Sequence, residues 1–183
     1  MGAFELVEGE FIRLRQDDGT WNAFEKDWRD QCATFEEDFD SYAEATFSAV
    51  REIIELEKKK AGVFALKMEG KHVAMCQLNK AAIPKYDSPV LRVRFITLSP
   101  EYDLAAKEID DYAGVLVEIL TQVLILSRTD DEMKSQYIKF HLRSPADRQF
   151  FSVLGKGLDG MQSFESVAMQ GAWLYIHQKV TEH

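Results

Sequence analysis

The sequence predicts a mixed α/β (α+β) fold, a mostly antiparallel sheet with helices on both faces. Short segments that alternate apolar and polar residues are interspersed with longer segments of helical periodicity. Glycine and proline mark many of the boundaries between them. No repeat, linker or change of composition divides the 183 residues. We therefore expect a single domain over residues 1–183 with the element order β-α-α-β-β-β-α-β-α-β-β.

The first half of the chain gives a strand, two helices and a hairpin. Residues 11–15 alternate at period two and are followed by a turn at Asp17-Asp18-Gly19. Residues 21–60 contain no proline or glycine and place apolar residues at helical spacing, so we expect two helices with a break near 31–35. Residues 63–67 and 72–78 then read as two strands joined by a tight turn at Glu69-Gly70.

The second half begins with a strand that we expect at the centre of the sheet. Residues 90–98 are long and β-branched, and Ser99-Pro100 closes them. A helix is expected over residues 110–127 and a strand over 137–142. Ser144-Pro145 predicts a further helix start, with the helix ending at Gly155. Two final strands are expected over residues 162–168 and 172–178.

Composition restricts the partners. The chain has 31 acidic and 22 basic residues and a formal charge of -9, which repels the phosphates of nucleic acids and anionic membrane surfaces. We expect no nucleic-acid partner and no membrane partner. The apolar run at residues 115–126 is too short to span a bilayer, and residues 1–6 lack the features of a secretory signal. These features favour a cytoplasmic protein.

Two cysteines, Cys32 and Cys76, are too few for a disulfide framework and lack the CxxC spacing of a zinc site. No metal-ligand cluster, nucleophilic triad or dinucleotide fingerprint can be assembled from the sequence. We therefore expect no metal and a reducing compartment.

The order of elements resembles the GNAT acyltransferase superfamily along nearly the whole chain. Residues 95–102, Phe-Ile-Thr-Leu-Ser-Pro-Glu-Tyr, look like the family's central strand and the start of its cofactor loop. The resemblance implies acetyl-CoA or another acyl-CoA as cofactor. It also implies that the backbone of the strand pairs with the pantetheine arm. The residues that would inherit this role are Phe95, Ile96, Thr97 and Leu98.

The next segment departs from the family pattern R/Q-x-x-G-x-G/A, whose backbone amides cradle a pyrophosphate. Asp103 stands at the first position, Ala106 replaces a glycine, and Glu108 fills the small last position. Ala105 and Ala106 would contribute the backbone contacts to the cofactor. The two carboxylates oppose a phosphate, each contact costing on the order of 1 kcal/mol.

A late helix resembles the family pattern A-x-x-F-Y-x-x-x-G-F, whose tyrosine often serves as general acid. Here Phe151 stands at the tyrosine position. A phenyl ring cannot donate a proton, so the usual acid is missing. Ser144 replaces the asparagine commonly found before this helix, and it can still cap the helix.

Several side chains are candidates for substrate contacts. Arg92 and Arg94 share one face of the central strand and would bind an anionic group, or pair with Asp and Glu residues instead. His141 ends its strand and is a candidate general base. The alternative for His141 is a hydrogen-bonded structural residue.

The last strand and the first helices supply two weaker candidates. Trp173, Tyr175 and His177 share a face and would line an acceptor pocket, with Tyr175 as substrate contact, or they are core or interface aromatics. At an edge of the sheet they would also offer a homodimer surface. The acidic residues 36–40 would attract a cationic amine, or form a solvated helix face.

Two functions follow from the resemblance. The first is an N-acyltransferase that transfers an acyl group from a CoA thioester to a small-molecule amine, with His141 or a water as base. The second is a non-catalytic GNAT-like module, because the loop glycines, the loop's basic charge and the tyrosine are lost together.

Overall fold

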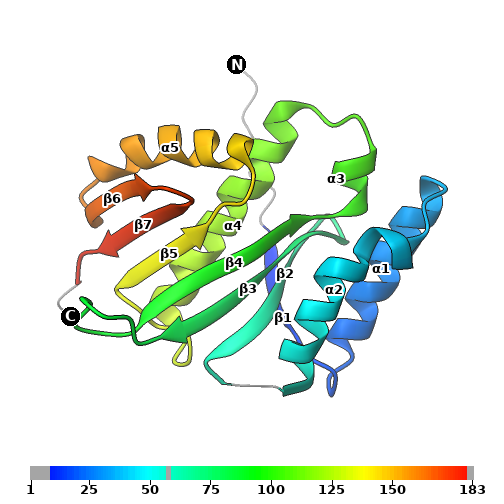
Figure 1. Cartoon of the computed structure of the whole chain (residues 1–183), viewed down its shortest axis with the longest axis horizontal. Helices are drawn as coiled ribbons and strands as arrows, with labels where there is room; N and C mark the ends of the chain where they lie inside the picture. Colours follow the sequence, from blue (N-terminus) through cyan, green and yellow to red (C-terminus); the bar gives the residue numbers. More distant parts are fainter. Residues whose placement is uncertain (1–8, 57–58, 181–183) are drawn as a thin grey trace.

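Seven strands form one sheet within residues 9–56 and 59–180, the part of the chain that the computed structural model describes. The strands are β1 (Glu10–Leu14), β2 (Ala61–Met68), β3 (Lys71–Ala81), β4 (Val90–Leu98), β5 (Tyr137–His141), β6 (Phe164–Gln170) and β7 (Trp173–Gln178). They are arranged in the order β1-β2-β3-β4-β5-β7-β6 (Figure 1). Neighbouring strands are antiparallel, except β4 and β5, which are parallel. The mixed, mostly antiparallel sheet is therefore confirmed.

The sequence predicted which strand lies at the centre of the sheet but not which strand lies at its edge. Strand β4 lies in the middle of the sheet, as its β-branched sequence predicts. The aromatic strand β7 is not at an edge, because it pairs with β5 on one side and β6 on the other. The expected edge surface for a homodimer is therefore wrong in its placement. Strand β6 suits the edge better, since four of its side chains are exposed, whereas Leu174, Ile176 and Gln178 of β7 are buried.

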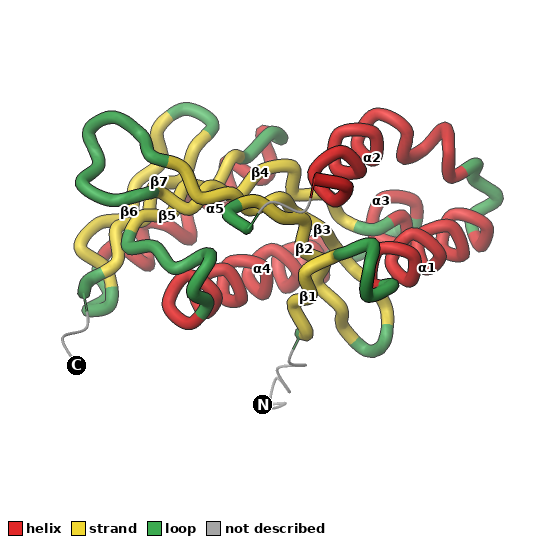
Figure 2. The backbone as a smooth tube through the Cα atoms, turned by 90° about the horizontal axis from the view of Figure 1, so that it is seen from below, coloured by secondary structure: helices red, strands yellow, loops and turns green. Residues whose placement is uncertain are grey.

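Helices cover both faces of the sheet, and Figure 2 shows α2 and α4 on opposite sides of it. The helices are α1 (Thr20–Thr34), α2 (Phe39–Leu56), α3 (Pro100–Leu104), α4 (Ile109–Thr129) and α5 (Pro145–Asp159). Helices α1 and α2 bury an aromatic cluster, which includes Trp21, Phe24, Trp28 and Phe47, against β1, β2 and β3. Helices α4 and α5 bury a second cluster, which includes Ile119 and Phe151, on the other face.

The helices leave part of one face without a core. Of the strands, the cluster under α1 and α2 involves only β1, β2 and β3. On the same face, β4, β5 and β7 carry half-buried polar and aromatic side chains, such as Arg92, Lys139 and Tyr175. A sheet face with this composition is open to a ligand, because its side chains are not committed to a helix interface.

The first two helices break later than the sequence predicts. Helix α1 continues to Thr34, and residues 35–38 connect it to α2. Glu36 adopts a left-handed backbone with φ 56°. The Asp38 carboxylate accepts hydrogen bonds from the backbone and hydroxyl of Ser41 at 3.0 and 2.7 Å, which starts α2. This local cap, rather than the hydrophobic period, sets the boundary.

Two further helix boundaries differ from expectation. Helix α5 continues through Gly155 to Asp159, because this glycine serves packing rather than termination. An added Cβ at Gly155 would lie 3.2 Å from Leu174 Cδ1, so the missing side chain lets α5 approach β7 closely. The short helix α3 was not predicted and starts at Pro100, where a proline at the first helical position is favoured.

Candidate functional site

Strands β4 and β5 separate halfway along β4 (Figure 1). They are paired only from Val90–Tyr137 to Val93–Phe140. Beyond this point β4 pairs with β3 alone, and His141 of β5 pairs with Trp173 of β7. Backbone groups of β4 that point toward β5 therefore lack a strand partner after Val93.

The separation coincides with a bulge in β4. Phe95 has φ 54°, which a non-glycine residue rarely adopts, and the register with β3 shifts between Met75 and Gln77. The candidate cofactor residues Phe95, Ile96, Thr97 and Leu98 are half-buried and follow the opening. An amide-bearing arm such as pantetheine fits this free strand edge, because it can take the place of the missing strand.

The loop before α4 is occupied by the chain's own carboxylates. The Glu108 side chain caps the first turn of α4, while Asp111 accepts a hydrogen bond from the Glu108 amide at 3.2 Å. Asp110 lies in the same turn. These groups use the amides and the helix dipole that a pyrophosphate would need. The loop, including Ala105 and Ala106, therefore does not fit a pyrophosphate.

Other charges near the loop are already paired. Lys107 lies in the loop, and its Nζ is 3.1 Å from a carboxylate oxygen of Glu101. The Nζ of Lys71 lies 3.2 Å from the other oxygen of the same carboxylate. Asp103 accepts a hydrogen bond from the Tyr42 hydroxyl at 2.5 Å, and loss of solvent raises the pKa of Asp103. Lys71 and Lys107 share the single Glu101 carboxylate, which leaves one net positive charge beside four carboxylates of the loop and the first turn of α4.

Four cations gather on the open half of the sheet, and we call this surface the cationic face. It consists of Arg92 and Arg94 on β4, Lys139 on β5, and Arg143 just beyond β5. Arg92 is directly opposite Lys139 in the parallel pair, so the two share a face. The alternative that Arg92 and Arg94 pair with Asp or Glu is not seen, since neither forms an ion pair within residues 9–56 and 59–180.

Aromatic rings hold three of these four cations in place. The Cζ atoms of Arg143 and Arg94 lie 4.5 and 5.2 Å from the centroid of the Phe95 ring. The Lys139 Nζ lies 4.5 Å from the Trp173 ring and 4.7 Å from the Tyr175 ring. Such contacts fix a cation without neutralising it.

His141 lies beside this cluster. Its ring is 4.6 Å from that of Trp173, and its side chain forms no hydrogen bond among the residues that the structure describes. Burial and the charges of Arg143 and Arg94 lower the pKa of His141 below its ordinary value of 6.5. The imidazole is therefore neutral at pH 7, the form that accepts a proton.

The remaining candidates are placed as follows. Trp173, Tyr175 and His177 are half-buried and belong to neither core cluster. His177 lies at the far end, stacked on Tyr137 at 4.5 Å and hydrogen-bonded to Gln136 at 3.0 Å. Tyr175 faces Lys139 and so remains part of the candidate site.

Two motif positions have structural roles. Phe151 is fully buried and packs against Phe140 in the cluster under α4 and α5. Ser144 caps α5 by accepting a hydrogen bond from the Asp147 amide at 2.9 Å, as predicted.

The acidic segment at residues 36–40 lies away from the cationic face. Residues 36–38 connect α1 to α2 and residues 39–40 start α2, so the segment is only partly helical, but its four acidic side chains are exposed, as the alternative of a solvated face predicts. Asp38 caps α2, and Asp40 forms an ion pair with Arg29 at 2.9 Å. These local partners account for two of its carboxylates.

A hydrogen-bonded pair of His72 and Asp27 was not predicted from the sequence. His72 Nδ1 lies 2.8 Å from Asp27 Oδ2, and the His72 amide donates to the same oxygen at 2.7 Å. Burial opposes ionisation of Asp27, but the hydrogen bonds from His72 and Gln31 lower its pKa. Trp28 Nε1 also donates to the His72 carbonyl at 3.0 Å. These bonds join α1 to β3 and complete a packed interface.

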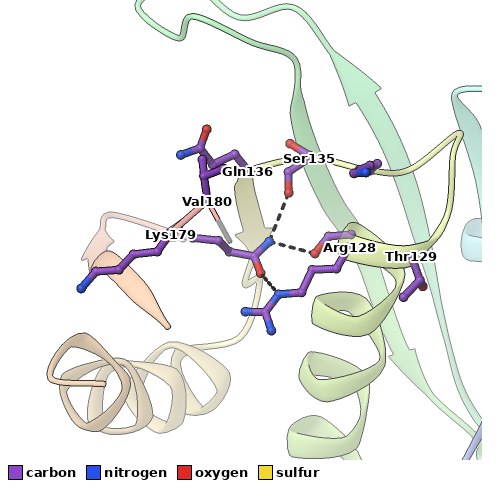
Figure 3. Close-up of a pocket in the computed structure, with 9 residues that line it drawn as sticks. Arg128, Thr129, Ser135, Gln136, Lys179 and Val180 are labelled. Carbon is purple, nitrogen blue, oxygen red and sulfur yellow. Dashed lines mark hydrogen bonds between the residues drawn. The ribbon is translucent and has the colours of Figure 1, made fainter. Parts of the chain in front are cut away.

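A separate cavity of about 450 Å³ lies where the end of α4 meets the end of β7 (Figure 3). Arg128 donates to the Gln178 side chain at 2.6 Å, and Gln178 donates to Ser127 and to the Ser135 carbonyl. These bonds satisfy the Gln178 amide and the Nε of Arg128. None of the predicted site residues lines it.

The residues that the structure describes offer neither a metal centre nor a membrane-spanning helix. No group of three or more His, Cys, Asp or Glu side chains among them is placed to hold a metal ion. No helix among them has the length and apolar character that crossing a membrane requires. The N-terminal stretch used for the cytoplasmic expectation lies outside the described residues.

Comparison with known proteins gives matches to solved structures. No protein-family model matches the chain, and no match was found among curated proteins. Solved structures align along most of it. A probable acetyltransferase from Staphylococcus epidermidis is 12% identical, with a TM-score of 0.49, over 92% of this chain and 95% of that one.

Two further structures give similar values. Spermidine N-acetyltransferase from Vibrio cholerae, solved with CoA and spermine, is 15% identical with a TM-score of 0.46, over 93% of this chain and 96% of that one. The GNAT domain of PAT from S. lividans is 11% identical with a TM-score of 0.45, over 92% and 88%. At these values the alignments carry no argument about activity.

Proposed function

We propose that the chain is a divergent GNAT-type N-acyltransferase, which transfers an acyl group from a thioester to an amine. The observation that supports this function best is the separation of β4 from β5 at the Phe95 bulge. It leaves a strand edge free along Phe95, Ile96, Thr97 and Leu98. An acyl-CoA would supply an activated thioester there, with its amide-bearing arm along this edge.

His141 is the proposed general base. Its lowered pKa keeps the imidazole neutral near pH 7, and it is half-buried at the end of β5, next to the opening. In the transfer, the amine nitrogen forms a bond to the acyl carbon, the thiolate leaves, and His141 accepts the amine proton. Phe151 cannot protonate the thiolate, so water takes that role.

The cofactor loop has a testable consequence. Because Glu108, Asp110 and Asp111 occupy the amides and dipole at the start of α4, the phosphates of CoA should gain little there. We expect acetyl-CoA to bind no more than about threefold more tightly than acetyl-pantetheine, which lacks the nucleotide. Isothermal titration of both ligands measures the difference.

Matched variants locate the effect. Replacing Glu108→Gln together with Asp111→Asn keeps hydrogen-bond acceptors and removes two charges. We expect acetyl-CoA to bind about fivefold or more tightly, at roughly 1 kcal/mol per contact, and acetyl-pantetheine to be unaffected. Asp131→Asn, beyond the other end of α4, is the control. If neither acetyl-CoA nor acetyl-pantetheine binds at millimolar concentration, the proposal of a thioester site is wrong.

The blocked loop also favours a second candidate function, a non-catalytic GNAT-fold module that uses its sheet face for binding. The motivating observation is the self-capped N-terminus of α4. Acyl transfer to any amine in a broad screen, abolished by His141→Asn, would rule this function out.

We also propose a cytoplasmic location, which the two buried free cysteines support. A homodimer stays a prediction.

A further inference from the structure

We propose that the cationic face binds a small organic molecule through a carboxylate or phosphate group, with Arg94 and Arg143 as its main ligands. The site lies on β4, β5 and β7 and is separate from the loop at α4. Binding there does not require acyl transfer, so it stands independently of the function proposed above.

Charge is the first observation. The chain carries a formal charge of -9, yet Arg92, Arg94, Lys139 and Arg143 gather on one surface. Within the described residues none of the four forms an ion pair. Like charges at close range repel one another, and an anion between them removes that cost. The arrangement is therefore favourable for an anionic ligand and unfavourable for a polyamine.

Unpaired buried atoms on the same face are the second observation. Arg92 Nε is buried without a hydrogen-bond partner, as are Gln77 Oε1 and Asn79 Oδ1. Gln77 and Asn79 of β3 are paired with Arg94 and Arg92 of β4, so these side chains share the face. Buried polar groups without partners are costly. An anion that reaches this floor would accept a hydrogen bond from Arg92 Nε, whereas the two amide oxygens need a donor, such as an ordered water or an N–H or O–H group of the ligand.

The third observation is the order imposed by aromatic rings. Phe95 has the guanidinium carbons of Arg94 and Arg143 within 5.2 Å of its centroid, and Trp173 and Tyr175 fix Lys139. Held in this way, the side chains lose less freedom on binding. Guanidinium groups bind carboxylate and phosphate in a bidentate geometry. The half-buried rings offer apolar surface to an organic body.

If the chain catalyses acyl transfer, the anion site restricts which amines can serve as the acyl acceptor. The candidate base His141 lies next to Arg94 and Arg143, whose charges act on it. An amine that also bears a carboxylate or phosphate could bind the arginines and present its nitrogen to the imidazole. This last step rests on the proposed acyltransferase function, whereas the anion site does not.

The test is titration of the full chain with single probes in the absence of any thioester. Succinate, benzoate and inorganic phosphate are compared with spermidine by isothermal titration and by thermal unfolding. We expect at least one anion to bind in the millimolar range or tighter and spermidine not to bind at this face. Succinate and benzoate against phosphate distinguish a carboxylate ligand from a phosphate ligand.

Variants assign the binding to the face. Arg94→Gln and Arg143→Gln should each weaken anion binding at least tenfold, while Arg94→Lys should retain part of it. Lys156→Gln, which removes one charge from an exposed position on α5, should have no effect. Circular dichroism confirms that each variant is folded. Absence of binding by all three anions, or equal loss in Lys156→Gln, would overturn the anion site.

The pKa of His141, measured by NMR, gives a second test that is independent of calorimetry and thermal unfolding. His141 faces Arg94 from β4, Lys139 on its own strand, Arg143 beyond it and the Trp173 ring from β7. A bound anion offsets the positive charges, so the pKa of His141 should rise when the anion is added. NMR titration of the imidazole, assigned with His141→Asn, measures this. An unchanged pKa at saturating anion would place the anion elsewhere.

Discussion

At the scale of single residues, His141 owes its candidate role to its neighbours. An isolated histidine titrates near pH 6.5. Here burial and the two guanidinium groups of Arg143 and Arg94 lower the pKa, so protonation is disfavoured in the folded chain. Any reaction that uses His141 as base should therefore keep its rate to a lower pH than an unperturbed imidazole would allow.

The charge of Arg143 can be tested directly. In Arg143→Gln we expect the pKa of His141 to rise toward 6.5, because one of the two positive charges is removed while burial stays. Lys156→Gln should leave it unchanged. NMR titration of the imidazole in both variants gives the comparison. A fall or no change in Arg143→Gln would show that the charge of Arg143 does not lower the pKa of His141.

Phe95 is the other residue whose conformation matters. Its φ of 54° is unusual for a side chain with a Cβ and costs of order 1–3 kcal/mol, which the surrounding strands must offset. The bulge separates β4 from β5 and places the ring beside Arg94 and Arg143. One strained residue thus joins the strand opening to the cationic face.

At the scale of elements, α4 and α5 show how the surroundings of a residue determine its role. The N-terminus of α4 is stabilised by its own Glu108 and Asp111, which gives a well-capped helix and a poor phosphate site. In α5, Gly155 is buried against Leu174, whereas nothing lies near Gly157. The two glycines share a helix but differ in their surroundings.

This difference predicts opposite results of one substitution. Gly157→Ala should stabilise the protein by about 0.5–1 kcal/mol, because alanine is the better helix former and its Cβ meets open space. Gly155→Ala should give no net gain, since its Cβ would meet the buried Leu174 side chain at 3.2 Å. Urea unfolding measures both. Equal gains would mean that α5 can shift away from β7 at no cost.

At the scale of the whole molecule, the sheet separates two hydrophobic clusters. Ile54 belongs to the cluster under α1 and α2, and Ile119 to the cluster under α4 and α5. Each side chain is at least 97% buried, with exposures of 3% and 1%. The clusters should therefore contribute to stability independently.

Double substitutions check this independence. Ile54→Val and Ile119→Val should each cost about 0.5–1.5 kcal/mol, and their sum should match the double variant within about 0.5 kcal/mol. Phe24→Leu with Phe47→Leu is the contrasting pair, because these rings stack at 5.8 Å in one cluster. That pair should deviate from additivity. Equal deviation in both pairs would mean that the sheet couples the clusters.

The sequence predicted the elements well because their signals are local. The long β-branched run predicted β4, and Ser144-Pro145 predicted the start of α5, both within a residue. Boundaries set by contacts between distant residues were missed. Gly155 looked like a helix end, although its role depends on Leu174 across the interface. The α1–α2 break, by contrast, depends on a local cap, the Asp38 carboxylate that accepts from Ser41, which the hydrophobic period does not reveal.

The candidate site divides in the same way. Periodicity placed Arg92 and Arg94 on one face of β4, and the structure retains that placement. Arg143 and Lys139 were not assigned to the site, because their approach to Phe95 and Trp173 depends on the strand order. Similarly, the pairing of β7 between β5 and β6 is a choice among possible partners that alternation alone does not specify.

By itself, the sequence determined the class of fold, the order of its elements and the carboxylates at the start of α4, because period, caps and charge are properties of neighbouring residues. Only the tertiary structure decided where β4 and β5 separate and which cations meet there. Those features arise from pairing and packing between segments far apart in the chain, where register, not composition, sets the distances.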